Sequence, residues 1–129
     1  MANLINWLEI PVSDFDRAKT FYESALSAQI QVDEKMAPGF KMGLIYTPNM
    51  ARTDIGGALV LGEGYVPGSN NTLVYLNANE TGGVDGFLER VKNAGGTVLS
   101  DKIFISEEIG YCAFFMDSEG NKLGVHSSK

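Results

Sequence analysis

Apolar residues recur at steps of three and four in two separate parts of the chain. The first stripe consists of Phe15, Ala18, Phe21, Tyr22, Ala25 and Leu26. This spacing puts apolar side chains on one helical face and predicts a helix over Asp14–Ser27. Ser13 is its expected N-cap, with Asp16 completing a variant capping box. The second stripe, formed by Val84, Phe87, Leu88 and Val91, predicts a helix over Thr81–Ala94 that ends at the glycines of NAGG.

Much of the remaining chain alternates or runs apolar between glycine, proline, asparagine and aspartate residues. The segments are INWLEIPV, AQIQVDE, FKMGLIYT, GGALVL, TLVYLN, GTVLSD, YCAFFMD and NKLGVHS. Short runs bounded in this way predict about eight β-strands. The order is then strand, helix and three strands, followed by the same order again.

The two halves match each other at an offset of 66 residues. Such a match indicates an internal repeat. It predicts an α+β fold, with residues 1–129 as a single domain of two βαβββ modules, about 1–66 and 67–129. The glycine-rich GEGYVPGSNN links them. The cap Ser13 falls on Asn79, and the apolar positions Leu8, Ile10, Ala18, Phe21, Tyr22 and Ala25 fall on Val74, Leu76, Val84, Phe87, Leu88 and Val91.

Alternation along each strand assigns side chains to the two faces of a sheet. In the first strand Leu8, Ile10 and Val12 form the apolar face, which leaves Trp7 and Glu9 on the open face. Apolar walls with a few polar groups are what a small-molecule pocket needs. The open faces therefore predict a ligand-binding cup. In module two they carry Leu73, Tyr75, Asn77, Lys122, Gly124 and His126.

Charge and cysteine content narrow the classes of partner. The 129 residues include ten Lys and Arg against 16 Asp and Glu, a net charge of −6. An acidic chain with scattered basic residues repels phosphate backbones, so nucleic acid is not an expected partner. No long apolar run or basic-flanked leader is apparent, and the single Cys112 cannot form an internal disulfide. We expect a cytoplasmic protein with no membrane attachment.

Three motifs carry a resemblance to a known superfamily. They are IPVSDFDRAKTFYESAL, GGALVLGEG and FFMDSEGNKLGVHS. Together with the paired modules, they resemble the vicinal oxygen chelate (VOC) superfamily of glyoxalases, bleomycin-resistance proteins and extradiol dioxygenases, and above all its small glyoxalase-like branch. The resemblance implies a glyoxalase/bleomycin-resistance-type cup and a homodimer, with cups formed within one chain or between chains.

The resemblance also implies where a metal would bind. Metal-dependent members hold the ion with His or Glu from the first and fourth strands of each module. The corresponding positions here are Trp7, Ala58, Leu73 and Gly124. None of these side chains offers a donor suited to a divalent ion, and a slip from Ala58 to Leu59 or Val60 would be no better. We expect neither a metal nor another cofactor.

The candidate polar and aromatic residues each have two interpretations. Trp7 lines a ligand cavity or fills a closed cup with aromatic bulk. Glu9 holds a cationic group or acts as a general base, or it is a hydrogen-bonded strut against Tyr75 or Lys122. His126 exchanges protons near neutral pH or is a solvated residue near the C-terminus.

Other positions have simpler expectations. Tyr75 and Asn77 provide a stacking wall and an amide for the ligand, or plain cross-strand contacts. Cys112 is typical of a small buried hydrophobic residue. Asp117–Asn121 predicts a hairpin turn with Gly120 at a positive φ. The loops Met36–Phe40 and Tyr65–Asn71 set the pocket volume, and periodicity does not define their conformations.

Two functions are compatible with these residues. One is metal-independent binding of an aromatic or cationic small molecule in the cup. The other is a glyoxalase-like lyase or isomerase, with Glu9 and His126 as catalytic groups or with a metal held elsewhere. A shared fold does not transfer chemistry where catalytic positions differ. The expected lining residues are Trp7, Glu9, Val60, Leu73, Tyr75, Asn77, Lys122 and His126.

Overall fold

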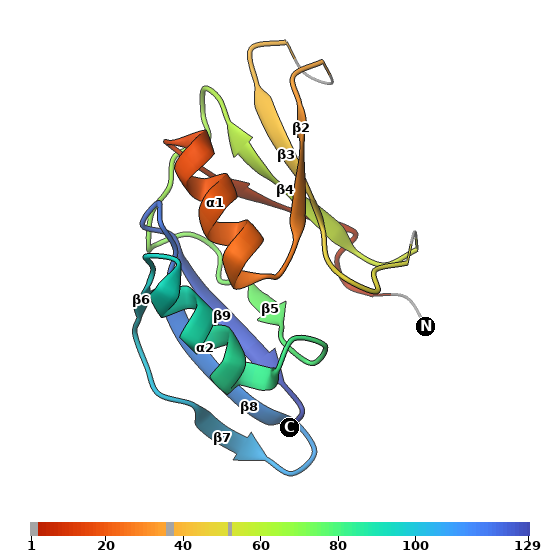
Figure 1. Ribbon diagram of the computed structural model, residues 1–129, viewed down its shortest axis with the longest axis vertical. Coiled ribbons are helices and arrows are strands. Elements are labelled where there is room, and N and C mark those ends of the chain that lie inside the picture. Colours follow the sequence, from red (N-terminus) through yellow and green to blue (C-terminus); the bar gives the residue numbers. More distant parts are fainter. Residues whose placement is uncertain (1–2, 36–37, 52) are drawn as a thin grey trace.

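Two sheets and two helices make up the protein in a computed structural model that describes residues 3–35, 38–51 and 53–129 (Figure 1). The predicted α+β class and the two modules of a strand, a helix and further strands are confirmed, with one strand more in the second module than βαβββ. Module one contains β1 (Trp7–Pro11), α1 (Phe15–Ala25), β2 (Gln29–Asp33), β3 (Lys41–Tyr46) and β4 (Gly56–Leu61). Module two contains β5 (Tyr75–Asn77), α2 (Gly83–Asn93), β6 (Thr97–Val98), β7 (Ile103–Ser106), β8 (Gly110–Met116) and β9 (Lys122–Ser127).

Strand pairing repeats between the modules. The first sheet has the order β1-β4-β3-β2, and the second has the order β5-β9-β8-β6, with β7 also pairing with β8. The first strand of each module runs parallel to the last. Glu9 lies opposite Ala58, and 66 residues further on Tyr75 lies opposite Gly124. The offset read from the sequence is therefore present in the strand register as well.

The second sheet has one strand more than its counterpart because the predicted GTVLSD strand is interrupted. The amides of Leu99 and Ser100 both donate to the carbonyl of Phe114, and the hydroxyl of Ser100 accepts from the Phe114 amide. Two residues opposite one form a bulge. The chain then pairs with β8 again as β7, a strand that the sequence reading did not predict.

One apolar core joins the two modules. Figure 1 shows α1 against the first sheet and α2 against the second, with the helices side by side. The predicted stripes of both helices are buried in this core. Phe21 of α1 stacks on Phe115 of β8 with ring centroids 6.4 Å apart. The face predicted to lie under the first helix is confirmed, because Ile10 and Val12 are buried there.

Both predicted N-caps are wrong. Asp14, not Ser13, caps α1, because its carboxylate accepts from the Arg17 amide at 3.0 Å. At α2 the cap is Gly82, at φ 89°, and not Asn79. The predicted C-terminal glycine is found, since Gly95 has φ 92°.

The turn after β8 is more than the hairpin turn that the sequence predicts. Gly120 has the expected positive φ of 85°. In addition, the buried carboxylate of Asp117 accepts from the hydroxyl of Tyr22 at 2.6 Å. The side chain of Asn121 donates to the carbonyl of Pro11 and accepts from the amide of Gly68. The turn therefore ties module two to α1, β1 and the linker, and we call residues 117–121 the clasp.

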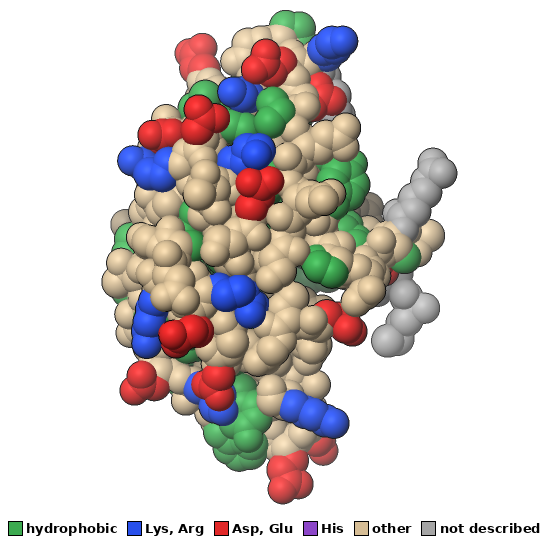
Figure 2. Space-filling model, viewed as in Figure 1, with side chains coloured by type: hydrophobic (Ala, Val, Ile, Leu, Met, Phe, Trp, Pro, Cys, Tyr) green, Lys and Arg blue, Asp and Glu red, His purple; other side chains and the backbone are tan. Residues whose placement is uncertain are grey.

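Charged side chains are interspersed on the visible face of Figure 2, with no large area of one sign. Both helices have 11 residues. Within the described residues, no helix is long and apolar enough to cross a membrane.

Candidate functional site

Two side chains of module one, those of Trp7 and Tyr65, meet at the exposed carboxylate of Glu9. Its Oε1 accepts from the hydroxyl of Tyr65 at 2.6 Å, and its Oε2 accepts from Nε1–H of Trp7 at 3.3 Å. The hydrogen bond to Glu9 and its negative charge raise the pKa of Tyr65 above its ordinary value. The partners of Glu9 in the structure are thus Trp7 and Tyr65, rather than Tyr75 or Lys122.

Tyr65 is held by a small second core on the open face of the first sheet. Met42, Ala58 and Val60 are buried there, and Phe40 packs against Tyr65 with ring centroids 5.7 Å apart. Val60 is 2% exposed, so it supports the cluster from beneath. In contrast, Trp7 remains 46% exposed at the edge strand β1, which is not the packing of a residue that fills a closed cup.

A cavity of about 500 Å³ lies between β1, the linker and the start of β9. We call it the linker cavity. Trp7, Glu9 and Tyr65 form one wall, and Lys122 contributes from β9. The other residues that line it are Ile5, Leu8, Ile10, Pro11, Gly64, Val66, Gly68, Asn71, Thr72, Val74, Asn121 and Leu123.

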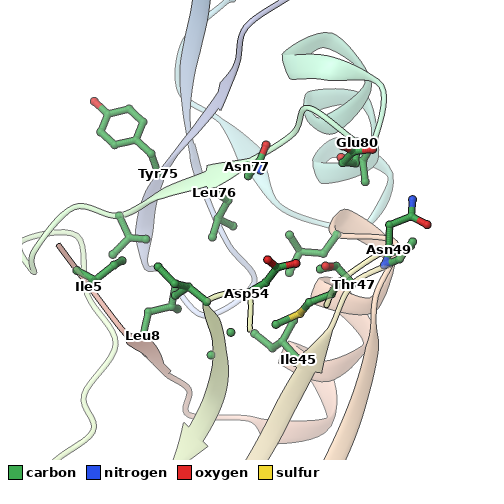
Figure 3. Close-up of a pocket in the computed structure, with 18 of the residues that line it drawn as sticks. Ile5, Leu8, Ile45, Thr47, Asn49, Asp54, Tyr75, Leu76, Asn77 and Glu80 are labelled. Carbon is green, nitrogen blue, oxygen red and sulfur yellow. The ribbon is translucent and has the colours of Figure 1, made fainter. Parts of the chain in front are cut away.

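A second cavity, of about 580 Å³, lies where β1 and the end of β3 approach β5 and the start of α2 (Figure 3). We call it the seam cavity. Tyr75 and Asn77 line it from β5, while Asp54 and Glu80 enter it from loops on opposite sides. Ile5, Leu8, Ile10 and Val74 line both cavities, so the two are neighbours along β1.

Tyr75 covers Gly124, the last of the four positions at which a metal site was expected. A Cβ atom at Gly124 would lie 2.5 Å from a ring carbon of Tyr75, so the glycine makes room for this ring. Tyr75 also packs edge-on against Phe114, with centroids 5.8 Å apart. The ammonium of Lys122 lies 5.3 Å from the Phe114 ring centroid. This part of the open face is therefore an aromatic surface.

His126 and Cys112 are cross-strand neighbours on β9 and β8. Nε2 of His126 lies 2.6 Å from the carbonyl oxygen of Ile109, a contact in which the ring nitrogen donates. The imidazole is half-buried, whereas Cys112 is 7% exposed. In the adjacent strand the side-chain oxygen of Asn77 accepts from the backbone and side-chain amides of Asn79.

The donor chemistry for a metal is missing from the four expected positions. Trp7, Ala58, Leu73 and Gly124 carry an indole, a methyl, an isobutyl and a hydrogen, none of which is a usual ligand of a divalent ion. Across residues 3–35, 38–51 and 53–129, no group of three or more His, Cys, Asp or Glu side chains is placed to hold one.

The predicted lining residues divide between several surfaces. Trp7, Glu9 and Lys122 share the linker cavity, and Tyr75 and Asn77 share the seam cavity. Val60, Leu73 and His126 line neither. Sequence reasoning missed Tyr65 as a partner of Glu9. The sequence does show a single aromatic residue in a glycine-rich linker. The direction in which the Tyr65 side chain points, however, depends on its packing against Phe40.

A pair of βαβββ modules with open sheet faces defines the class of protein. The family model "Glyoxalase/Bleomycin resistance protein/Dioxygenase superfamily" matches residues 4–124, and the chain belongs to this superfamily. A "Glyoxylase-like domain-containing protein" from Didymella fabae is 30% identical over 118 residues, covering 91% of this chain and 88% of that protein. The resemblance seen in the sequence is confirmed.

Solved structures share the fold. FosX, a fosfomycin resistance protein from Listeria monocytogenes, superposes with a TM-score of 0.64 at 14% identity, covering 100% of this chain and 93% of its own. An antibiotic-binding protein from a Streptomyces species gives a TM-score of 0.62 at 21% identity, covering 97% and 95%. Small-molecule binding is thus found among proteins of this fold.

Proposed function

We propose that the protein binds a small aromatic molecule in the linker cavity, without a metal. The observation that carries this proposal is the half-exposed indole of Trp7 at the wall of a cavity of about 500 Å³, hydrogen-bonded to Glu9. Cavities of about 300–1,000 Å³ suit small ligands. An indole whose N–H is already engaged presents its ring face to an aromatic ligand.

The charges in this cavity favour an aromatic ligand over a cationic one. Both oxygens of Glu9 already accept hydrogen bonds from Trp7 and Tyr65. Lys122 lines the same cavity with a positive charge. For a ligand cation, the attraction to Glu9 would therefore be offset by the repulsion from Lys122. In this role Glu9 orients the indole rather than neutralising the ligand.

A lyase or isomerase reaction remains the alternative from the sequence, with Glu9 and His126 as its catalytic groups. Glu9 lies on β1, in the first sheet, while His126 lies on β9, in the second, with its Nε2 at the Ile109 carbonyl. Acid–base catalysis needs both groups within reach of one substrate. Binding is the function that this geometry supports better.

A titration followed by NMR tests the aromatic site. The single Trp7 gives one indole N–H resonance, and 2-phenylethanol can be compared with 2-cyclohexylethanol, which has a similar size but no aromatic ring. We expect the phenyl compound to shift this resonance and to bind at least about twofold more tightly, since aromatic pairing adds roughly 0.5–1.5 kcal/mol. Trp7→Leu should remove the preference, whereas the control Tyr46→Leu, at an equally exposed position of β3 that lines neither cavity, should keep it. Equal affinities for both compounds in the unmodified protein would contradict the proposal.

Metal independence is tested separately, by elemental mass spectrometry on untagged protein purified without chelator. The proposal expects a negligible ratio of metal to chain. A near-stoichiometric amount of zinc, nickel, iron or manganese would overturn it and direct attention to Glu9 and His126 as ligands.

We also propose that the chain is a cytoplasmic homodimer. The resemblance to the superfamily supports the dimer, and exposed apolar side chains on β7, such as Phe104 at 57% exposure, are available for an interface. A free thiol at Cys112 fits a reducing compartment. Sedimentation equilibrium should give twice the chain mass of 14.0 kDa. A mass of one chain at micromolar concentration would contradict the dimer.

A further inference from the structure

The seam cavity has a chemical character unlike that of the linker cavity. Its inner wall is apolar, made by Leu8, Ile10 and Leu76 from the strands with Ile45 and Leu26 beside them. Polar groups gather at its rim. Figure 3 shows Asp54 and Asn49 from the loop after β3 on one side, and Asn77 and Glu80 from module two on the other.

Among the residues that the structure describes, the charged groups that line this cavity all have one sign. Asp54 and Glu80 line it, and no lysine or arginine does so among the described residues. Asp54 Oδ2 accepts from the Ala51 amide at 2.8 Å, which holds the loop. Glu80 has no ion pair or hydrogen-bond partner in the described part of the chain. Arg90 is not in the lining, because its Nε donates to the carbonyl of Ala25 and its guanidinium lies over Phe87.

A buried polar atom also lies in the wall. The hydroxyl oxygen of Thr81, a residue that lines the seam cavity, is buried and has no hydrogen-bond partner among the residues described. Nearly all buried polar groups in proteins have a partner, whether protein, water or ligand. The hydroxyl of Thr81 is therefore an unsatisfied polar group in the wall of the seam cavity.

From this arrangement we propose that the seam cavity is a second binding site, specific for a small organic ammonium ion. The apolar inner wall receives the hydrocarbon body of the ligand. The ammonium group lies at the rim, where Asp54 and Glu80 supply the opposite charge and Asn49 supplies a hydrogen-bond acceptor. A cavity of about 580 Å³ accommodates a ligand of this kind.

This site is independent of the proposed aromatic site. The two cavities share part of one apolar wall, but their polar groups differ: Glu9 and Lys122 are in the linker cavity, and Asp54 and Glu80 are in the seam cavity. An ammonium ligand is therefore expected to affect loop 47–55 and residues 74–81. The aromatic probe should instead affect residues 64–72 and Trp7.

The test compares three probes of the same length: n-hexylammonium, hexan-1-ol and hexanoate. Each is titrated into ¹⁵N-labelled full-length protein at neutral pH and followed by amide chemical shifts. We expect hexylammonium to bind most tightly and hexanoate least, with the largest shifts in loop 47–55 and in residues 74–81. Equal affinity of hexylammonium and hexan-1-ol, or shifts confined to the linker cavity, would overturn the proposal while leaving the aromatic site unaffected.

Three variants assign the effect to the carboxylates. Glu80→Gln and Asp54→Asn should each weaken hexylammonium binding by about fivefold, the upper range for an exposed ion pair. Binding of hexan-1-ol should be unchanged. Glu107→Gln, an equivalent change on the exposed turn after β7, is the matched control and should bind like the unmodified protein. If Glu80→Gln, which disturbs no described contact, behaves like Glu107→Gln, the site is not the one proposed.

Discussion

Glu119 in the clasp and Glu9 on β1 are both carboxylates that accept several hydrogen bonds, yet their surroundings are opposite. The Glu119 side chain is 0% exposed and accepts from the amides of Ser13 and Asp14 and from Nε of Arg17 at 2.7 Å. Glu9 is exposed and accepts from Trp7 and Tyr65 at the edge of a cavity.

This difference indicates that Glu119 stabilises the fold, whereas Glu9 is available to take part in binding. Three of the partners of Glu119, namely Ser13, Asp14 and Arg17, come from module one and lie more than a hundred positions away in sequence, so breaking these contacts loosens the joint between the modules. The partners of Glu9 belong to its own module, and water can replace them. Loss of a contact to a buried charge is costly, whereas loss of a contact to a hydrated one is not. We therefore expect substitutions in the clasp to change the stability of the protein. Substitutions of Trp7, Glu9 or Tyr65 should instead change ligand binding.

Glu119→Gln is expected to have the largest effect. It removes the charge that Arg17 pairs with, and it places an amide where a carboxylate accepts from two backbone amides. We expect the free energy of unfolding to fall by about 3 kcal/mol, the upper end of the range for hydrogen bonds to a charged group, because the Glu119 side chain is buried although Arg17 is half exposed. Urea unfolding measures this. Asp85→Asn, which breaks the exposed ion pair with Lys102, is the control and should cost less than about 1 kcal/mol. Similar losses in both variants would show that the clasp is not a joint.

Acidification should protonate the Glu119 carboxylate and so destabilise the protein. Burial raises the pKa of Glu119, but hydrogen bonds from Arg17, from the amides of Asp14 and Ser13, and from Ser118 outweigh it and lower the pKa to about 2. Because the folded pKa lies below the unfolded one, this stabilisation is complete above about pH 4.5 and declines as the pH falls through 2. The loss amounts to about 3 kcal/mol, since each pKa unit is about 1.4 kcal/mol.

Stability measured from pH 6 to pH 2 tests this. Glu119→Gln should lose less on acidification than the unmodified protein, because it has no carboxylate to protonate at this position. An identical decline in both proteins would mean that other carboxylates carry the acid sensitivity.

The elements and the repeat could be predicted from the sequence because they depend on local periodicity. Apolar stripes identified both helices, and the 66-residue offset reappears in the pairs Glu9–Ala58 and Tyr75–Gly124. The clasp could not be predicted as a joint. Hydrogen bonds such as that between Tyr22 and Asp117 link residues 95 positions apart, and the turn pattern of residues 117–121 shows only the local part of their role.

Tyr22→Phe should have an intermediate effect. Tyr22 is fully buried, and burial, followed by the charge of Asp117, raises its pKa well above the ordinary value. The substitution removes only the hydroxyl and leaves one oxygen of Asp117 with Asn121 as its remaining partner. We expect a loss of about 1–2 kcal/mol in the free energy of unfolding, the usual cost of an unmade buried hydrogen bond. Urea unfolding of this variant measures the loss, and no change would indicate that Asp117 is satisfied without the hydroxyl.

The site was only partly predictable for a related reason. Strand alternation placed Trp7 and Glu9 on one face, but it could not show which residues of other segments would surround them. In the structure the predicted residues are divided between two cavities, and Val60 lies beneath Phe40 and Tyr65. Loop conformation decides both outcomes, and it follows from packing rather than from periodicity.

Tyr65→Phe should have the smallest effect on stability. It is the same substitution as Tyr22→Phe, but it removes a hydroxyl that contacts the exposed Glu9 instead of the buried clasp. It removes the hydrogen bond to Glu9, whose carboxylate is exposed and can accept from water instead. We expect a change of less than about 0.5 kcal/mol in the free energy of unfolding, typical of surface positions. Binding of 2-phenylethanol should change instead, because Glu9 loses the partner that holds it against the Trp7 indole. A stability loss as large as that of Tyr22→Phe, with unchanged binding, would place Tyr65 in the packing of module one rather than in the site.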